Sequence, residues 1–550
     1  MLEIFKNKID KPSPSNELIS SQTFLTRKKH FRDTEEWKLK KRRIISKLKI
    51  MSKFNLALVL SRLPTIDKLP DKVLMNIFSY LPSQQMLRAR QVCKRWKRVV
   101  DNPALWKFVS FRQNYGGLVV ANLDYFLGLI GSRFCELKIT ELATDLITPS
   151  VLHEMANRCL KLQYLTLDFS TAMQLHDFTD LQSFPSRLKG LTLCLSENIF
   201  LEGFLRKVYT FISSVEILHI VGTYEKVEDE EEEVYETVNV HKLKQYLPNL
   251  RVVNLWGVPF ITDEHVEALS SNCAYLECLC VNYCEKVTGS CLKLLLQRCK
   301  KLRTLFLAHA KLDNATIQSI EWQNTKVEEL DIKGTEVSAD TIISILTRLP
   351  NLRWLDASWL ENFNDSVLEA WMASGTASNI QYLNLDTCDS LNENCLSEFV
   401  MRHGHQLRGL NLGGHHKLLE YFWINMIPQM RNINVLVMGI AEDCCPKVTA
   451  KIHVDQFIDC IAGNCPRLAR LEIRWDDDTL RFSDKSSKFI DVMRLKCLKL
   501  HSMVLSDGQY YELVRSNFER ADRMSVVRTT EMCRTGLLNC SRYYNQLLFN

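Results

Sequence analysis

Four histidines lie within fourteen residues of one another and are the side chains best suited to hold a metal ion. Imidazole nitrogens are common zinc ligands. The apolar spacing Leu407, Leu410 and Leu412 separates the two pairs, however, and no cysteine spacing completes a ligand set. We therefore expect no metal site here, and no cofactor anywhere in the chain. The four histidines are His403, His405, His415 and His416.

Catalytic motifs are missing from the sequence. It contains no G-x-x-x-x-G-K-[ST], no G-x-G-x-x-G, no G-x-S-x-G and no H-E-x-x-H, so nucleotide binding, serine hydrolysis and zinc peptidase chemistry have no support. The vicinal pair Cys444 and Cys445 could be redox-active, but a pair of loop thiols is the more ordinary interpretation. We expect a protein that is not an enzyme.

Most of these histidine and cysteine side chains lie within a repeated sequence motif. Its core is L-x-x-L-x-L, and the first apolar positions lie 25 to 28 residues apart, except for two gaps of 35. This is the period of leucine-rich repeats, so we expect an α/β horseshoe of about 13–14 strand–helix units over residues 111–510. Stacked units build a long concave surface for binding. The clear motif begins at Leu162, Leu165 and Leu167 and is last expected at Leu495, Leu498 and Leu500.

Six of the nineteen cysteines follow the same period, which argues against a disulfide scaffold. Some lie three residues before the first apolar position of a unit, and others eight residues after it. Cysteines spaced in this way are small buried side chains, one per unit. We expect free thiols in a reducing, intracellular compartment. The first set is Cys159, Cys273, Cys299 and Cys465, and the second is Cys284 and Cys388.

Length, composition and charge set further limits. The 550 residues are 46% apolar and carry a formal net charge of +6, which gives no general attraction to nucleic acid. The apolar runs are short, so none predicts a membrane-spanning helix. The N-terminus lacks the long apolar stretch of a secretory signal. We expect no membrane association, no nucleic-acid partner, and a cytoplasmic or nuclear location.

Residues 1–60 form a basic leader that we expect to be largely disordered. Its densest block resembles a nuclear-localisation patch, and a solvated basic tail is the equally good alternative. Two longer repeat units carry inserts, an acidic loop at 225–236 and a second insert at 440–455, and residues 511–550 are a C-terminal cap or tail. The nuclear-localisation candidates are Lys38, Lys40, Lys41, Arg42 and Arg43.

Residues 64–110 form a compact helical unit ahead of the repeats. The apolar spacing after Leu69-Pro70 predicts a helix that ends at Leu81-Pro82, and a second helix leads to Trp96. The segment LPDKVLMNIFSYLPSQQMLRARQVCKRWKRVVDNPALWKFVSF resembles an F-box along its whole length. With the repeats that follow, the chain resembles the F-box/leucine-rich-repeat proteins.

The resemblance implies the substrate-recognition subunit of a Skp-cullin-F-box ubiquitin ligase. In that family the F-box binds a Skp-type adaptor and, through it, cullin and RING subunits, while the repeats hold a protein target. The chemistry belongs to the E2 enzyme. A non-degradative scaffold or stoichiometric inhibitor, anchored through the F-box, is the alternative. The adaptor contacts carried over to this sequence are Leu69, Pro70, Leu74, Ile77, Phe78 and Leu81.

Strand alternation points the residues between the motif leucines away from the core and onto the concave face. Between residues 254 and 386 these positions combine aromatic rings with carboxylates, a combination typical of interface anchors. The alternatives are a polar face with scattered aromatics, or a face covered by the chain's own C-terminal tail. The substrate-binding candidates are Trp256, Phe306, Glu329, Asp331, Trp354, Asp356, Tyr382 and Asp386.

Overall fold

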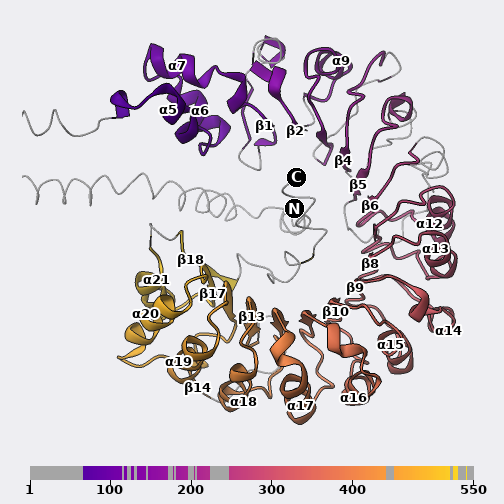
Figure 1. Cartoon of the computed structure of the whole chain (residues 1–550), viewed down its shortest axis with the longest axis vertical. Coiled ribbons are helices and arrows are strands. Elements are labelled where there is room, and N and C mark those ends of the chain that lie inside the picture. Colours follow the sequence, from indigo (N-terminus) through magenta and orange to yellow (C-terminus); the bar gives the residue numbers. More distant parts are fainter. Residues whose placement is uncertain are drawn as a thin grey trace, which may run out of the picture. The chain divides into compact units, whose positions relative to one another are not determined.

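The computed structural model describes about three quarters of the chain, which divides into two compact units, Met1–Leu137 and Lys138–Asn550 (Figure 1). The leader with Lys38–Arg43, the acidic loop 225–236 and positions 441–450 of the second insert lie outside the described residues. The described residues are 66–113, 117–120, 126–128, 133–143, 146–170, 178, 181–195, 204, 207–222, 247–440, 451–520, 524–530 and 541.

The described part of the first unit is a small helical core. Helix α5 begins after Pro70 and helix α6 after Pro82, where a missing N–H costs nothing because the first helical residues have no intrahelical acceptor. Leu74 and Val100 are fully buried, and Trp106 Nε1 donates to Val100 O at 2.7 Å. The elements are η1 Ile66–Lys68, α5 Asp71–Phe78, α6 Ser83–Ala89, α7 Lys94–Val100, η2 Pro103–Leu105, β1 Phe108–Ser110 and η4 Phe134–Glu136.

The second unit is built on one parallel sheet whose strands follow each other in sequence order. Within this unit, Figure 1 shows the strands along the inner side of an arc and the helices along its outer side. The strands are β2 Ile139–Ala143, β3 Tyr164–Asp168, β4 Gly190–Cys194, β5 Ile217–Val221, β6 Val252–Asn254, β7 Cys278–Cys280, β8 Thr304–Phe306, β9 Glu329–Asp331, β10 Trp354–Asp356, β11 Tyr382–Asn384, β12 Gly409–Asn411, β13 Val435–Met438, β15 Arg470–Ile473, β17 Ser502–Leu505 and β18 Val526–Thr529.

Helices cover one face of this sheet, and a separate pair of short strands, β14 Ile452–His453 and β16 Leu480–Arg481, forms a second sheet. Several helices start at a side-chain cap, which satisfies backbone N–H groups that have no partner within the helix. The helices are α9 Pro149–Arg158, α12 Asp263–Ser270, α13 Leu292–Arg298, α14 Asn314–Gln318, α15 Ala339–Leu346, α16 Asp365–Ser374, α17 Glu393–His403, α18 Glu420–Met426, α19 Val454–Asn464, α20 Ser486–Lys496 and α21 Tyr511–Phe518, with 3-10 turns η6 Tyr209–Phe211, η7 Trp322–Asn324, η8 Thr376–Asn379, η9 Gly404–Gln406 and η10 Ile427–Gln429.

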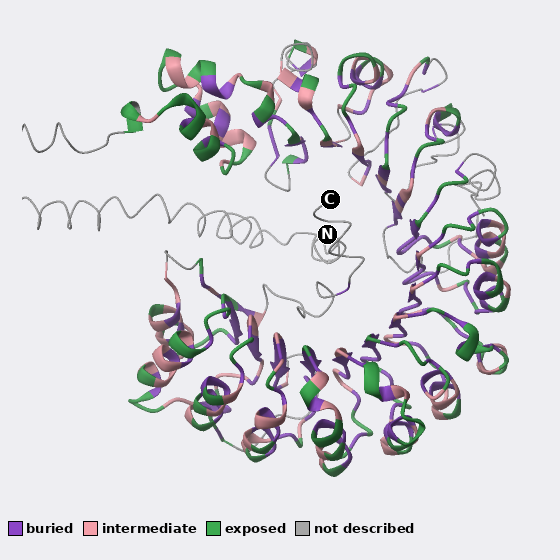
Figure 2. Cartoon of the chain, viewed as in Figure 1, coloured by how far each residue is buried: buried purple, intermediate pink, exposed green. Residues whose placement is uncertain are grey.

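Motif leucines stack from unit to unit and form the core. Leu330 pairs with Leu355, and Leu383 pairs with Leu410, each at the centre of its strand and each buried (Figure 2). The α/β solenoid expected from the repeat is confirmed. In the described part of the chain, no helix is both long and apolar enough to cross a membrane.

A corner side chain ties each of three units to the unit before it. Cys284 Sγ donates to Leu255 O at 3.1 Å, and Cys388 Sγ donates to Ala357 O at 3.2 Å. His415 occupies the equivalent place, eight residues after the first apolar position, and its Nε2 donates to Leu385 O at 2.7 Å. In these three units a cysteine thiol and a histidine ring therefore serve equally as the corner donor.

One position adopts a left-handed backbone in the units whose first apolar residues run from Leu250 to Leu407. It lies seven residues after the first apolar position and is glycine in some units, such as Gly334 with φ +58°. Three other units place an aromatic or imidazole ring there: Tyr283 at φ 61°, His309 at 57° and Trp359 at 62°. A side chain in this region costs about 1–2 kcal/mol, so these three residues are strained where glycine would be relaxed.

The last motif lies five residues later than the sequence pattern indicated. Leu498 is 70% exposed, whereas Met503 is fully buried at the centre of β17. The unit therefore begins at Leu500, with Met503 and Leu505 as its inner positions. The sheet also continues past residue 510, because β18 pairs in parallel with β17.

Candidate functional site

An apolar patch on the first unit lies along helix α5 and the turn that follows it. Val73, Ile77 and Tyr80 are 41%, 39% and 82% exposed, and they follow Pro70 at intervals of three or four residues. This spacing places the side chains on one side of the helix. We call Pro70, Val73, Ile77 and Tyr80 the α5 patch. Exposed apolar groups gathered in this way mark an interaction surface.

Four of the six predicted adaptor contacts lie outside this patch. Leu74 and Phe78 are buried, and Phe78 packs edge-on against Trp96 with ring centroids 5.0 Å apart. The expectation that these two face a partner is wrong, because they hold α5 on the other helices. Leu69 and Leu81 are half-buried.

Pro70 and Ile77 are the predicted contacts that are exposed, whereas Val73 and Tyr80 were not among the predicted contacts. The sequence carried a signal for both, since Val73 is four residues before Ile77 and Tyr80 is three residues after it.

Ion pairs hold the start of α5 against α7. Asp71 accepts hydrogen bonds from Arg95 Nε at 2.8 Å and from Arg98 Nη2 at 2.9 Å, and Arg95 also donates to Leu69 O. These hydrogen bonds, from Arg95 first and then Arg98, lower the pKa of Asp71. The α5 patch is thus presented by a helix whose N-terminus is fixed.

The concave aromatic residues of the second unit are not exposed anchors. Trp256, Phe306 and Trp354 are 4%, 1% and 2% exposed, and the rings of Phe306 and Trp354 lie 5.4 Å apart. Tyr382 is half-buried and packs against Val435 and Val437. The expectation of accessible rings on this face is therefore wrong for the first three residues.

The concave carboxylates are buried as well, and they already bind groups within the chain. Asp331 accepts hydrogen bonds from Lys333 N at 3.1 Å and from Asn282 Nδ2 at 2.9 Å. Asp356 lies directly opposite it in the sheet and accepts from Ser358 N at 3.0 Å and from Asn384 Nδ2 at 2.8 Å. Burial, followed by the charge of Asp356, raises the pKa of Asp331 to about 7.

The other two predicted carboxylates also have partners. Asp386, which is half-buried, lies 3.6 Å from Arg474 Nη1, and Arg474 also pairs with the fully buried Glu472 at 2.8 Å. Glu329 Oε2 accepts from Thr304 Oγ1 at 3.1 Å and from Ser541 Oγ at 2.7 Å. The expected row of unopposed acids is therefore a network of satisfied acceptors.

Comparison with known proteins places the F-box-like unit in a family. The model of the F-box-like family matches residues 66–112. F-box/LRR-repeat protein 12 of Mus musculus is 25% identical over 316 residues, covering 54% of this chain and 89% of that protein. The protein of the same name from Homo sapiens is 30% identical over 134 residues, covering 24% of this chain and 40% of that protein.

Residues 66–112 therefore match the F-box-like family, and the chain as a whole is similar to F-box/leucine-rich-repeat proteins. An F-box implies a Skp-type adaptor as partner, and proteins of this family are generally non-catalytic. Among solved structures, a chain from the yeast Rad7 and Elc1 complex aligns with a TM-score of 0.42 and 14% identity, covering 79% of this chain and 96% of that chain.

The left-handed positions form an aromatic rim beside the concave face, which sequence reasoning did not identify. Tyr283 stacks on His309 with centroids 4.5 Å apart, and the rings of His309 and Trp359 lie 6.4 Å apart. Trp359 is 50% exposed, with Lys333 Nζ 5.1 Å from its ring centroid. The strain at these positions and the exposure of Trp359 make this rim a candidate contact for a partner.

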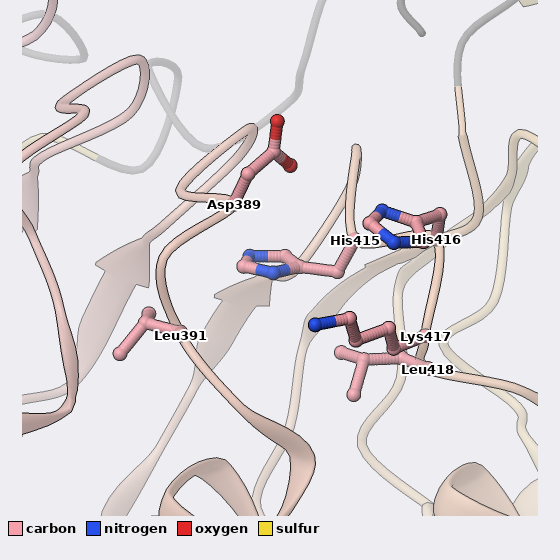
Figure 3. A pocket seen from close by; sticks show the side chains of 6 residues that line it. All are labelled: Asp389, Leu391, His415, His416, Lys417 and Leu418. Atoms are coloured by element: carbon pink, nitrogen blue, oxygen red, sulfur yellow. The ribbon is translucent and has the colours of Figure 1, made fainter. Parts of the chain in front are cut away.

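Two of the four clustered histidines, His415 and His416, line a small pocket between neighbouring repeats. Figure 3 shows His415, His416 and Lys417 on one segment and Asp389 and Leu391 on another. His415 is 5% exposed, already donates to Leu385 O, and has a pKa lowered by burial. Among the described residues, no group of His, Cys, Asp and Glu side chains could hold a metal ion.

Proposed function

We propose that this chain is the substrate-recognition subunit of a Skp-cullin-F-box ubiquitin ligase. The α5 patch would bind the Skp-type adaptor and, through it, the cullin and RING subunits, and the repeat unit would hold a protein target. The exposed apolar row on α5, within an F-box-like segment, is the observation that carries the proposal. The chain would contribute positioning, since holding a target near the E2 raises the effective concentration of the reacting groups.

The adaptor interface can be tested by placing charge on the α5 patch. Val73→Asp and Ile77→Asp put a carboxylate where an apolar partner would have to cover it, and desolvating an unpaired charge is unfavourable. The full-length variants should bind a purified Skp-type adaptor at least about 30-fold more weakly than wild type, as expected for hot-spot positions. Calorimetry gives the dissociation constant.

Two controls separate adaptor binding from folding. Leu160→Asp changes an exposed leucine of the second unit and should leave adaptor binding unchanged. Leu74→Ala removes buried core volume and should lower the stability of the F-box unit by about 2–5 kcal/mol. Wild-type adaptor affinity in both aspartate variants would contradict the proposed interface.

We also propose that the target is recognised on the concave side of the second unit. The rim residues His309, Lys333 and Trp359 support this, because they combine an exposed ring, a cation and backbone strain. Trp359→Ala, compared with Met401→Ala on α17, should weaken target capture by about tenfold or more.

A further inference from the structure

A row of polar side chains follows the edge of the main sheet where the chain enters each strand. Each member directly precedes its strand, and backbone hydrogen bonds join it to the next: Arg303 N donates to Glu277 O at 2.8 Å, and Glu328 N donates to Arg303 O at 2.7 Å. From Arg251 to Glu328 the charges alternate in sign. Arg251 Nη2 lies 2.6 Å from Glu277 Oε1, and Arg303 Nη1 lies 2.5 Å from Glu328 Oε1. In this part of the row, which we call the entry row, each arginine therefore has a carboxylate from an adjacent repeat.

The entry row continues through three further members, where the alternation lacks its acid. Gln381 N donates to Arg353 O at 2.8 Å, and Arg408 N donates to Gln381 O at 2.7 Å. Arg353 and Arg408 are exposed, and Gln381 is half-buried between them. Within the part of the chain that the structure describes, neither guanidinium forms a hydrogen bond or an ion pair. An amide thus stands where the earlier members of the row have a carboxylate.

The turns around these residues do not supply the missing negative charge. The four consecutive turns from helix to strand, 346–353, 374–381, 402–408 and 429–434, contain no acidic residue. The acids of the same repeats lie beyond the other ends of the strands, as Asp365 and Glu393 do in the first turns of α16 and α17. Since the strands are parallel, all four turns lie at one edge of the sheet. That edge therefore carries a net positive charge.

We propose that this edge binds an acidic segment of a protein partner, with one glutamate or aspartate of the segment seated over Gln381, between Arg353 and Arg408. Neighbouring strands lie about 4.8 Å apart, so the backbones of the two arginines are separated by roughly 10 Å. A carboxylate midway lies within reach of both guanidiniums, and the Gln381 amide offers it a neutral donor. This inference deepens the proposed function, because it names the chemistry of the segment that a target would present.

The entry row favours a protein carboxylate over a nucleic acid. A phosphate backbone is bound through many unpaired cations along its length, whereas Arg251 and Arg303 of the same row are already neutralised by glutamates. Those internal pairs also show which group fits an arginine of this row, namely a side-chain carboxylate. Charge-assisted bonds of this kind are about twice as strong as neutral ones.

Gln381→Glu tests the proposal because it supplies the missing acid from within the chain. The new carboxylate would pair with Arg353 and Arg408 and exclude that of a partner. The probe is a fluorescein-labelled peptide of alternating glutamate and serine, and anisotropy at low ionic strength measures its binding to the full-length chain without adaptor. We expect Gln381→Glu to weaken binding by at least about fivefold, and Arg353→Gln with Arg408→Gln by at least about tenfold. The melting temperature of Gln381→Glu should equal or exceed that of wild type, which separates loss of the site from loss of the fold.

Lys286→Gln is the matched control, since it lowers the net charge by the same single unit at an exposed position beyond the other ends of the strands. It should bind the peptide as wild type does, and a peptide with glutamine in place of glutamate should not bind wild type. Unchanged affinity in Gln381→Glu would overturn the proposal. Binding of a uridine oligonucleotide without binding of the glutamate peptide would also overturn it, in favour of a nucleic-acid surface. Because no adaptor is present, failure of this test leaves the α5 patch unaffected, and failure at the α5 patch leaves this result unaffected.

Discussion

At the residue scale, the paired carboxylates Asp331 and Asp356 have a role within the fold. Each accepts a backbone N–H two residues further along the chain and an asparagine amide, which comes from two units earlier for Asp331 and from the next unit for Asp356. Sequence alternation correctly placed both on the outward side of their strands. It could not show that asparagine partners on other strands already occupy them, because those partners are 49 and 28 residues away in the chain.

The raised pKa of Asp331 predicts a pH dependence of stability. Because the folded value of about 7 exceeds the usual 3.8, the unfolded chain binds fewer protons between these values, so the free energy of unfolding falls as pH rises through this window. Asp331→Asn removes this titration. The melting temperature of the variant minus that of wild type should become more positive from pH 5 to pH 8. A difference that stays flat across this range would contradict the assignment.

The repeat cysteines give a second prediction at this scale. Every cysteine that the structure describes is a free thiol, and burial raises the pKa of Cys273, Cys284 and Cys465 to about 12. Since the thiolate is the reactive form, these three should resist N-ethylmaleimide in the native protein and react only after unfolding. The exposed Cys93 and Cys135 are internal controls and should label at once. Mass spectrometry of labelled peptides reads the result, and rapid native labelling of Cys273 would refute it.

At the element scale, backbone conformation predicts opposite effects for two glycine substitutions, one at a left-handed turn and one inside a helix. A Cβ on Gly334, at φ +58°, would lie 2.3 Å from the His309 ring, so Gly334→Ala should destabilise the chain by about 1–3 kcal/mol. Gly463 lies in helix α19, and a Cβ added there would meet no atom within 4 Å, so Gly463→Ala should stabilise the chain by about 0.5 kcal/mol. Thermal unfolding measures the change in melting temperature of both variants, and equal changes would contradict this account of the turn.

The strands were predictable because a leucine at each central position repeats with one period. The predicted register was wrong at the last unit, because Leu495, Leu498 and Leu500 have the spacing of the motif by chance. Cys497 carried the correcting signal, since it lies three residues before Leu500, as Cys465 does before Leu468. In α5 the prediction failed differently. Both sides of that helix are apolar, so spacing alone could not separate the buried Leu74 and Phe78 from the exposed Val73 and Ile77.

At the scale of the whole molecule, the order of a small helical segment followed by a repeat solenoid was predictable from the sequence. The burial of the concave face did not, because it depends on contacts such as Ser541 with Glu329 that no local pattern encodes. An outward position in a strand predicts the direction in which a side chain points, but it does not predict how exposed that side chain is. The candidate target surface therefore shifts from Trp256, Phe306 and Trp354 towards the exposed rim at Trp359.

The central claim is that the chain couples a captured protein to degradation through the α5 patch. The most direct measurement compares cells that express wild type with cells that express the Val73→Asp, Ile77→Asp variant, by affinity purification and by the half-lives of the captured proteins. We predict a set of proteins that both forms capture and whose half-lives lengthen only with the variant. Captured proteins with the same half-life in both cells would contradict the account and favour a scaffold or stoichiometric inhibitor.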